Sequence, residues 1–91
     1  MVKLKRSEQM KTDIFIQAIR KRNYLQFLYG LEQIDIEPYY IARNKFGRKI
    51  IYGRVKNTNE VRKFEYNKIA NIRVVNSFRF SPVIPINTFA S

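Results

Sequence analysis

The sequence predicts a mainly β domain (α+β) in which one N-terminal helix precedes a five-stranded, strongly bent β-barrel. Apolar residues recur at helical spacing before residue 24 and alternate with other residues after it. Turn residues then separate short apolar runs at intervals of about 8 to 12 residues, which is typical of small barrels. A chain of 91 residues has the length of one compact domain.

The predicted helix begins near Thr12 and Asp13, either of which can accept hydrogen bonds from its free N–H groups, or earlier at Ser7. Basic residues 20–22 occupy the last turn, where cations offset the negative end of the helix dipole. Asn23 is the expected exit, because asparagine tolerates the left-handed conformation. The residues expected at helical spacing are Met10, Ile14, Phe15, Ala18, Ile19 and Lys21.

Five short strands are expected after this helix. Gly30 ends the first strand, and Gly47 supplies the positive φ of a turn over residues 44–47. Pro38 interrupts the second strand and must lie at an edge or a bulge, since it cannot donate to a ladder. The expected strands cover residues 24–29, 34–42, 48–56, 60–65 and 69–76.

The chain divides into three expected segments. Residues 1–11 form a basic N-terminal segment, and residues 12–80 form the barrel domain with its leading helix. Residues 81–91 form an extended tail, which we expect to lie over the body of the domain or against a partner.

The charge is strongly basic and unevenly placed. The formal net charge is +11, from 18 Lys and Arg against 7 Asp and Glu. Residues 1–23 carry +5, residues 24–42 carry −3, and residues 43–91 carry +9. Such asymmetry favours a surface that contacts a polyanion, most often nucleic acid, although a solubilising coat of lysines is the alternative.

The composition argues against several classes of protein. The chain has no His, which removes the usual general base, and no Cys, which removes disulfides and thiolate nucleophiles. We therefore expect no enzyme activity, no metal site and no cofactor. No apolar stretch approaches the roughly 20 residues that span a bilayer, and no signal peptide is recognisable, so we expect no membrane contact and a cytoplasmic location.

Several short motifs between Ile14 and Phe80 occur in a suggestive order. They are Ala18-Ile19, residues 25–30 (Leu-Gln-Phe-Leu-Tyr-Gly), Glu37-Pro38-Tyr39, residues 47–53, Arg62-Lys63-Phe64 and Asn67-Lys68-Ile69. In this order they resemble the WYL domains, small Sm-like (SH3-like) β-barrels found mostly in bacterial transcriptional regulators and CRISPR-associated proteins. The resemblance implies that fold in a stand-alone, divergent form.

Two departures separate the chain from the pattern of the WYL domains. The Trp-Tyr-Leu tripeptide is replaced by Lys49-Ile50-Ile51, which keeps only the aliphatic third position. The Asp-Arg pair is replaced by Asn67-Lys68, which keeps the cation but loses the carboxylate and the planar guanidinium.

The third expected strand carries the first group of candidate site residues. Period-two alternation places Arg48, Ile50, Tyr52, Arg54 and Lys56 on one face. A basic stripe with an aromatic ring in its middle suits a strand that follows phosphates and stacks a base. The alternative is that Tyr52 belongs to the core and the basic residues surround it. We favour the core for Tyr52 and the contact role for the arginines.

A second group of candidates follows in the fourth and fifth strands. Alternation places Arg62 on the face of Phe64, where it either reaches a bound anion or pairs with Glu37 or Asp35. The resemblance favours the site, because the arginine of this motif lies in the ligand groove of WYL domains, and it implies that Lys68 is a second cation nearby. The aromatic residues Tyr29 and Tyr40 are candidate walls, although packing is the role that we favour for both.

These expectations point to a non-catalytic regulatory or accessory module that binds nucleic acid or a nucleotide-type anion, with single-stranded DNA or RNA preferred. One alternative is a homo-oligomeric interaction module, because exposed sheet edges favour a homodimer. The other is a small RNA-cleaving toxin, which could work without His by using Glu, Arg, Lys and Tyr.

Overall fold

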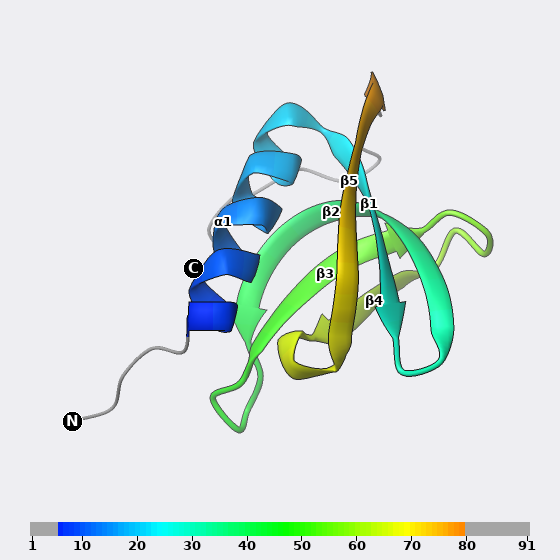
Figure 1. Ribbon diagram of the computed structural model, residues 1–91. Helices are drawn as coiled ribbons and strands as arrows, with labels where there is room; N and C mark the ends of the chain where they lie inside the picture. The colour runs from blue at the N-terminus through cyan, green and yellow to red at the C-terminus, as the bar shows by residue number, and fades with distance from the viewer. Residues whose placement is uncertain (1–5, 80–91) are drawn as a thin grey trace.

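The computed structural model describes residues 6–79, with side chains described from residue 8 to residue 75. The described chain has one α-helix, five strands and one short 3-10 helix, which confirms the predicted mainly β architecture (Figure 1). Residues 1–5 of the basic segment and the predicted tail, 81–91, lie outside the described residues. The elements are α1 (Arg6–Lys21), β1 (Asn23–Tyr29), β2 (Glu32–Arg43), β3 (Lys49–Val55), β4 (Val61–Glu65), η1 (Tyr66–Lys68) and β5 (Ile69–Arg79).

Both ends of the helix differ slightly from expectation. It begins at Arg6, close to the earlier of the two predicted starts, and Thr12 shares a hydrogen bond of 3.1 Å with the Tyr66 hydroxyl instead of capping the helix. The predicted exit at Asn23 is wrong by one residue. Arg22 adopts the left-handed conformation, with a φ of 57°, because the 5% exposed Asn23 is already the first residue of β1.

The buried face of α1 is narrower than the predicted stripe. Phe15, Ala18 and Ile19 are buried against the sheet, and the ring of Phe15 meets the Tyr66 ring edge-on at 5.1 Å. Met10 was expected in the stripe, but it is 61% exposed. No helix in the described part of the chain is both long enough and apolar enough to cross a lipid bilayer.

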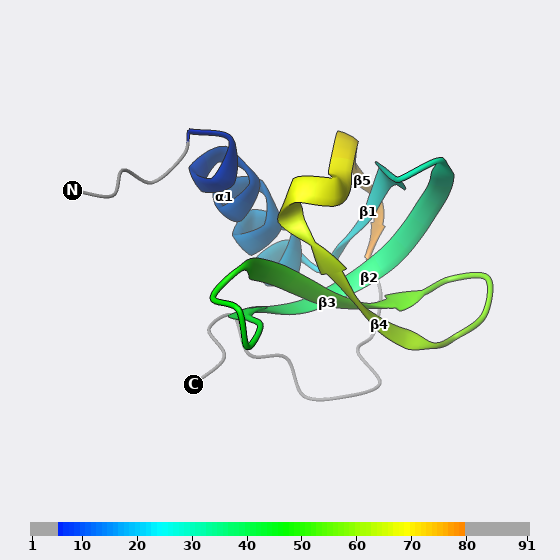
Figure 2. The ribbon, with the colours of Figure 1, turned by 90° about the horizontal axis from the view of Figure 1, so that it is seen from below.

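The five strands form one antiparallel sheet in the order β4-β3-β2-β1-β5. The 12-residue strand β2 pairs with β1 over residues 32–36 and with β3 over residues 36–43, so it belongs to both halves of a strongly bent sheet (Figure 2). Within residues 6–79 no ladder joins β4 to β5. The predicted closure of this sheet into a barrel is therefore not confirmed.

The bend lies where Pro38 interrupts β2. The ladder with β3 shifts register between Pro38 and Tyr40, which leaves Tyr39 as an extra residue and places Pro38 opposite Gly53. The predicted position of Pro38 at an edge or a bulge is confirmed as a bulge, since β2 is the central strand. Because Gly53 has no side chain, the two backbones approach closely here.

The core fills the inner side of this bend. Phe27 and Phe64 meet edge-on at 5.2 Å between the two halves of the sheet, and aliphatic residues of β1, β2 and β3 surround them. On β3 the residues Ile51, Gly53 and Val55 turn one face inward as the alternation predicts, and Ile50 on the other face is also buried. The remaining face of β3 is available to a site.

We predict that Gly53→Ala destabilises the fold by about 1 to 3 kcal/mol, as expected for an overpacked core. A Cβ atom at this position would lie 2.6 Å from Ile36 Cδ1 and 2.8 Å from the carbonyl oxygen of Glu37. Because valine lacks Cδ1, Ile36→Val removes the first clash, so the two substitutions together should cost less than the sum of their separate costs. Urea unfolding of the wild type and the three variants measures this coupling, and additive costs would contradict it.

Tyr66 makes the stability of the fold sensitive to high pH. Burial raises the pKa of its hydroxyl to about 12, whereas an unfolded tyrosine titrates near pH 10. Below about pH 10 both states keep the proton. Between about pH 10 and pH 12 only the unfolded state releases it, so the free energy of unfolding falls as pH rises.

We predict that the stability difference between the wild type and Tyr66→Phe shrinks by up to about 2 kcal/mol over that pH interval, because phenylalanine has no proton to release. Urea unfolding of both proteins at several pH values measures the difference directly. Effects of pH that the two proteins share cancel in the comparison. A difference that stays constant with pH would show that Tyr66 ionises equally easily in both states.

Candidate functional site

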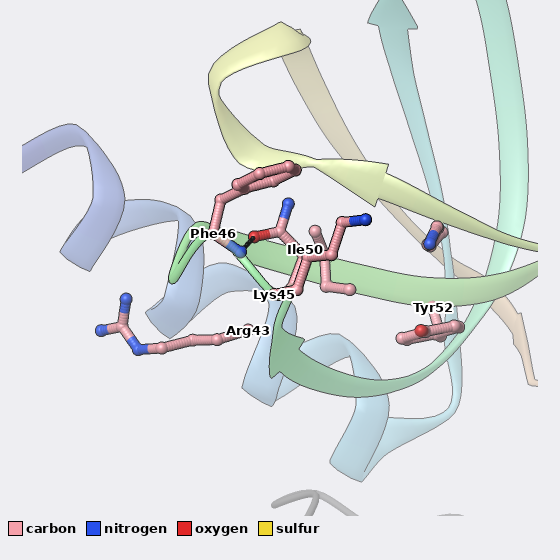
Figure 3. Close-up of a pocket in the computed structure, with 7 residues that line it drawn as sticks. Arg43, Lys45, Phe46, Ile50 and Tyr52 are labelled. Atoms are coloured by element: carbon pink, nitrogen blue, oxygen red, sulfur yellow. Dashed lines mark hydrogen bonds between the residues drawn. The ribbon is translucent and has the colours of Figure 1, made fainter.

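Two adjoining grooves lie beside the turn that joins β2 to β3. The first has a volume of about 420 Å³, and Figure 3 shows the turn residues Lys45 and Phe46 together with Ile50 and Tyr52 of β3. Three cationic residues and two aromatic residues line it, and none of its described lining residues carries a carboxylate. The lining residues are Arg43, Asn44, Lys45, Phe46, Ile50, Tyr52 and Lys63.

The turn over residues 44–47 forms as the sequence predicts, and hydrogen bonds to Asn44 hold it in place. The Asn44 Oδ1 accepts hydrogen bonds from the backbone N–H of Phe46 at 2.9 Å and of Arg48 at 3.0 Å. Gly47 adopts a φ of 77°, and its N–H donates to the Asn44 carbonyl at 2.9 Å. These bonds fix the loop while leaving the Phe46 side chain 72% exposed. An exposed ring is thus presented on a structured turn.

The floor of the first groove comes from three neighbouring strands. Tyr52 of β3 lies opposite Lys63 of β4 in the ladder and stacks on Tyr40 of β2, with ring centroids 4.5 Å apart and planes 22° apart. Burial raises the pKa of the Tyr40 hydroxyl, and the electrostatic interaction with Tyr52 raises it further. Our interpretation of Tyr52 as a core residue is wrong, because it lies half-buried on the face opposite to Ile51.

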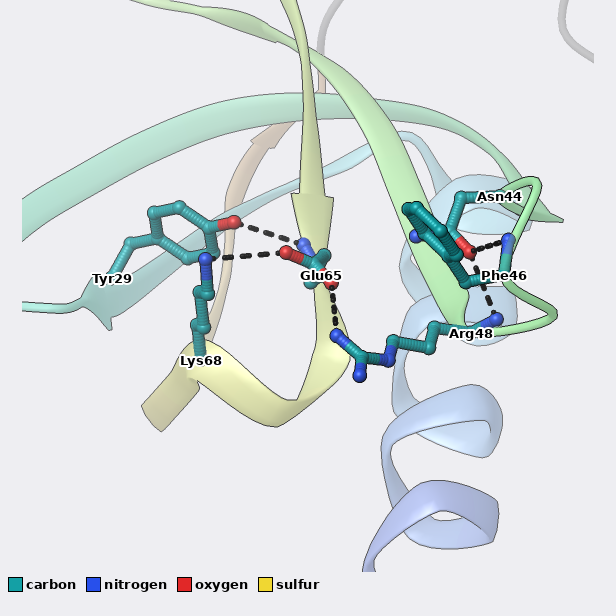
Figure 4. Close-up of polar contacts among 6 residues, drawn as sticks. All are labelled: Tyr29, Asn44, Phe46, Arg48, Glu65 and Lys68. Atoms are coloured by element: carbon teal, nitrogen blue, oxygen red, sulfur yellow. Dashed lines mark hydrogen bonds and ion pairs between the residues drawn. The ribbon is translucent and has the colours of Figure 1, made fainter.

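The second groove, of about 290 Å³, shares Asn44, Phe46, Ile50 and Lys63 with the first. Its remaining lining residues are Tyr29, Arg48 and Glu65. Glu65 lies between two cations, 3.6 Å from Arg48 and 3.2 Å from Lys68, as Figure 4 shows. Its backbone N–H donates to the Tyr29 hydroxyl at 3.1 Å. The positive charge of this groove is therefore partly neutralised from within.

Arg54 and Lys56, which share a strand face with Tyr52, are engaged in other contacts. The Arg54 Nη2 lies 2.8 Å from Oε2 of Glu37, whose side chain also accepts a hydrogen bond of 3.0 Å from the Tyr39 hydroxyl. The hydrogen bond to Glu37 raises the pKa of Arg54. The Lys56 ammonium lies 4.3 Å from the centre of the Tyr24 ring. Neither residue lines either groove.

Arg62 lies on the Phe64 face of β4, as the alternation predicts, with its guanidinium carbon 5.0 Å from the centre of the Phe64 ring. Among the described residues it forms no ion pair, and Glu37, one of its two expected partners, is bound by Arg54. Arg62 is partly buried and lies outside both grooves.

The structure thus brings together only part of the predicted site. Tyr52 lines the first groove, whereas Tyr40 lines neither groove and only stacks on Tyr52. Tyr29 and Arg48 line the second groove, and Lys68 pairs with Glu65 at its side. The sequence analysis did not select the turn as a site, although an apolar residue beside cations in a polar turn was a usable signal. The lining residues of the two grooves that it missed are Arg43, Asn44, Lys45, Phe46, Ile50, Lys63 and Glu65.

The fold resembles a solved structure, the proteasome accessory factor B/C (PafBC) of Arthrobacter aurescens. The two chains superpose with a TM-score of 0.72 and are 22% identical, over 82% of this chain and 13% of that chain. The likeness supports a WYL-like fold, and this chain corresponds to a small part of the larger protein. No protein-family model and no curated protein sequence matches the chain.

We predict that Arg54→Ala destabilises the protein more than Arg48→Ala does. The carboxylate of Glu37 is in a residue only 5% exposed, so removal of Arg54 leaves a buried charge without its cation. Arg48 pairs with Glu65 near the surface, where an ion pair contributes little. Urea midpoints measure the order, and Glu37→Gln should restore part of the loss in the Arg54→Ala background. Equal losses for the two arginine variants would contradict the structural role of Arg54.

Proposed function

We propose that this chain is a non-catalytic WYL-like module whose first groove binds single-stranded nucleic acid. The observation that carries the proposal is the exposed ring of Phe46, held on a fixed turn beside a groove with three cations and no described carboxylate. Aromatic rings stack on unpaired bases, and cations of Lys and Arg neutralise the phosphates between them. Both kinds of group are present within one groove.

Several features favour a single strand over a duplex. A base can stack on Phe46 only when it is not stacked inside a duplex. The helix α1 packs Phe15, Ala18 and Ile19 into the core and is the one α-helix of residues 6–79, so this part of the chain has no helix-turn-helix for the major groove. The paired rings of Tyr40 and Tyr52 extend an aromatic surface from the turn along the sheet. This surface supports a ligand of more than one nucleotide.

The remaining predicted cations have a secondary place in this proposal. Arg48 and Lys68 are held by Glu65, and Arg54 is held by Glu37, so each has less charge to offer a phosphate. Lys45 and Lys63 form no ion pair among the described residues. We therefore assign the main phosphate contacts to Lys45, Lys63 and Arg43. Arg62 and Lys56 are not needed for this site.

A regulatory or accessory role fits a small module that binds without altering its ligand. The WYL-like fold supports that role, since WYL domains are found mostly in regulators. The likeness to a protein named as a proteasome accessory factor points the same way. We propose a bacterial regulatory complex as the setting, with transcription as the first process to examine.

We predict that Phe46→Ala weakens binding of a fluorescent oligonucleotide of about ten nucleotides by roughly tenfold or more, the effect expected when one stacked base is lost. Lys63→Ala should also reduce the salt dependence of binding, by about 0.7 in the slope of log K against log salt concentration. Fluorescence anisotropy at several salt concentrations, with single-stranded DNA and RNA, measures both effects.

The matched control is Lys21→Ala, which removes the same charge from the last turn of α1. The opposite end of this helix is the part that lies beside Arg43. The effect of Lys21→Ala on binding should be small. If the wild type fails to bind at low salt, or if Lys21→Ala and Lys63→Ala weaken binding equally, the groove is not the site.

Two further measurements test the alternative functions. Light scattering tests for a homodimer that forms without ligand, and gel analysis of the same RNA after incubation tests for an RNA-cleaving toxin.

A further inference from the structure

We propose that the first groove selects bases with a carbonyl group at the pyrimidine 4-position, uracil and thymine, over cytosine. The Asn44 side-chain amide donates the hydrogen bond that makes this selection. The proposal rests on the proposed function and names the class of base that it favours. It is carried by the hydrogen bonds that orient Asn44 and by the chemistry of the side chains around it.

The orientation of the Asn44 amide is determined by its partners. The side-chain atom between the backbone N–H groups of Phe46 and Arg48 receives two donors, at 2.9 Å and 3.0 Å, and must therefore be the acceptor oxygen. The amide nitrogen is consequently on the other side, and Figure 4 shows the amide beside the Phe46 ring. Asn44 lines both grooves. Its NH2 group forms no hydrogen bond among the described residues and can donate to a ligand.

The surrounding side chains are also donors. Arg43, Lys45 and Lys63 can donate hydrogen bonds but cannot accept them, and Ile50 and Phe46 do neither. Among the described side chains of the first groove, only the Tyr52 hydroxyl can accept a hydrogen bond without losing one already formed. Beside these donors, a ring position that carries an oxygen is therefore better matched than one that carries an amino group.

Uracil and cytosine differ at this edge but not in size. Uracil carries an oxygen at position 4, which accepts a hydrogen bond, whereas cytosine carries an amino group, which donates one. Figure 4 shows the Asn44 amide beside the Phe46 ring, and in the proposed arrangement a base stacked on this ring presents its position 4 to the amide. Cytosine in that position places its amino group against the amide NH2 group. Both groups are donors, so neither finds an acceptor.

The test compares oligouridine with oligocytidine of about ten nucleotides, which have matched length and charge. Wild-type protein should bind oligouridine roughly fivefold tighter or more, the discrimination expected from one hydrogen-bonded base contact. Asn44→Asp keeps an oxygen for the Phe46 and Arg48 N–H groups but replaces the amide donor with a second carboxylate oxygen. This variant should weaken binding of both ligands and abolish or invert the preference for uridine.

Asn67→Asp on η1 is the matched control, because it makes the same chemical change at an exposed position that lines neither groove. It should leave the ratio of the two affinities unchanged. Thymidine and deoxycytidine oligonucleotides should show the same preference, which separates base recognition from recognition of the sugar. Circular dichroism and thermal unfolding establish that Asn44→Asp keeps the fold, and Asn44→Ser provides a neutral variant that removes the amide donor.

The outcomes distinguish this inference from the proposed function. Equal affinity of the wild type for uridine and cytidine, or a preference that survives in both Asn44→Asp and Asn44→Ser, overturns the role of Asn44 while leaving the groove as the binding site. Absence of binding to every oligonucleotide at low salt overturns both proposals. A uridine preference that is lost in both Asn44 variants and kept in Asn67→Asp supports both.

Discussion

The close contact between β2 and β3 at Pro38 and Gly53 is the constraint on which the rest of the structure depends. Pro38 cannot donate to the ladder, and the extra residue Tyr39 bends the strand. One 12-residue strand can therefore pair with β1 over its first part and with β3 over its second. The bend encloses the aromatic core around Phe27 and Phe64. It also directs the end of β2 to the turn that carries Asn44 and Phe46.

The chain has a net charge of +11, and a small number of carboxylates determines which of its cations are paired. Glu37, from the acidic stretch 24–42, lies buried beside Arg54, and Glu65 lies between Arg48 and Lys68. Within the described chain these pairs leave Lys45 and Lys63 without a carboxylate partner. Cations without a carboxylate partner and an exposed aromatic ring therefore coincide at the turn that carries Phe46. This coincidence is the basis on which we propose the groove as a binding surface for nucleic acid.

Local signals predicted the elements, whereas the site required pairings between distant residues. The turn at Gly47, the bulge at Pro38 and the shared face of Arg62 and Phe64 could all be predicted from neighbouring residues. The groove could not, because Lys63 joins Tyr52 only through the register of β4 on β3. The role of Tyr52 was misjudged for the same reason, since alternation separates two faces of a strand but does not identify the buried one.

The sequence by itself determined a single helix followed by five strands, the turns between them and an excess of positive charge. These properties depend on backbone preferences and on charges that each residue carries wherever it lies. Only the tertiary structure decided which cations are neutralised, because Glu37 and Glu65 reach their partners after the strands have paired. It likewise decided that Asn44 turns its oxygen to the backbone and its NH2 group away from it. The fold, and not the composition, therefore locates the surface that can recognise a ligand.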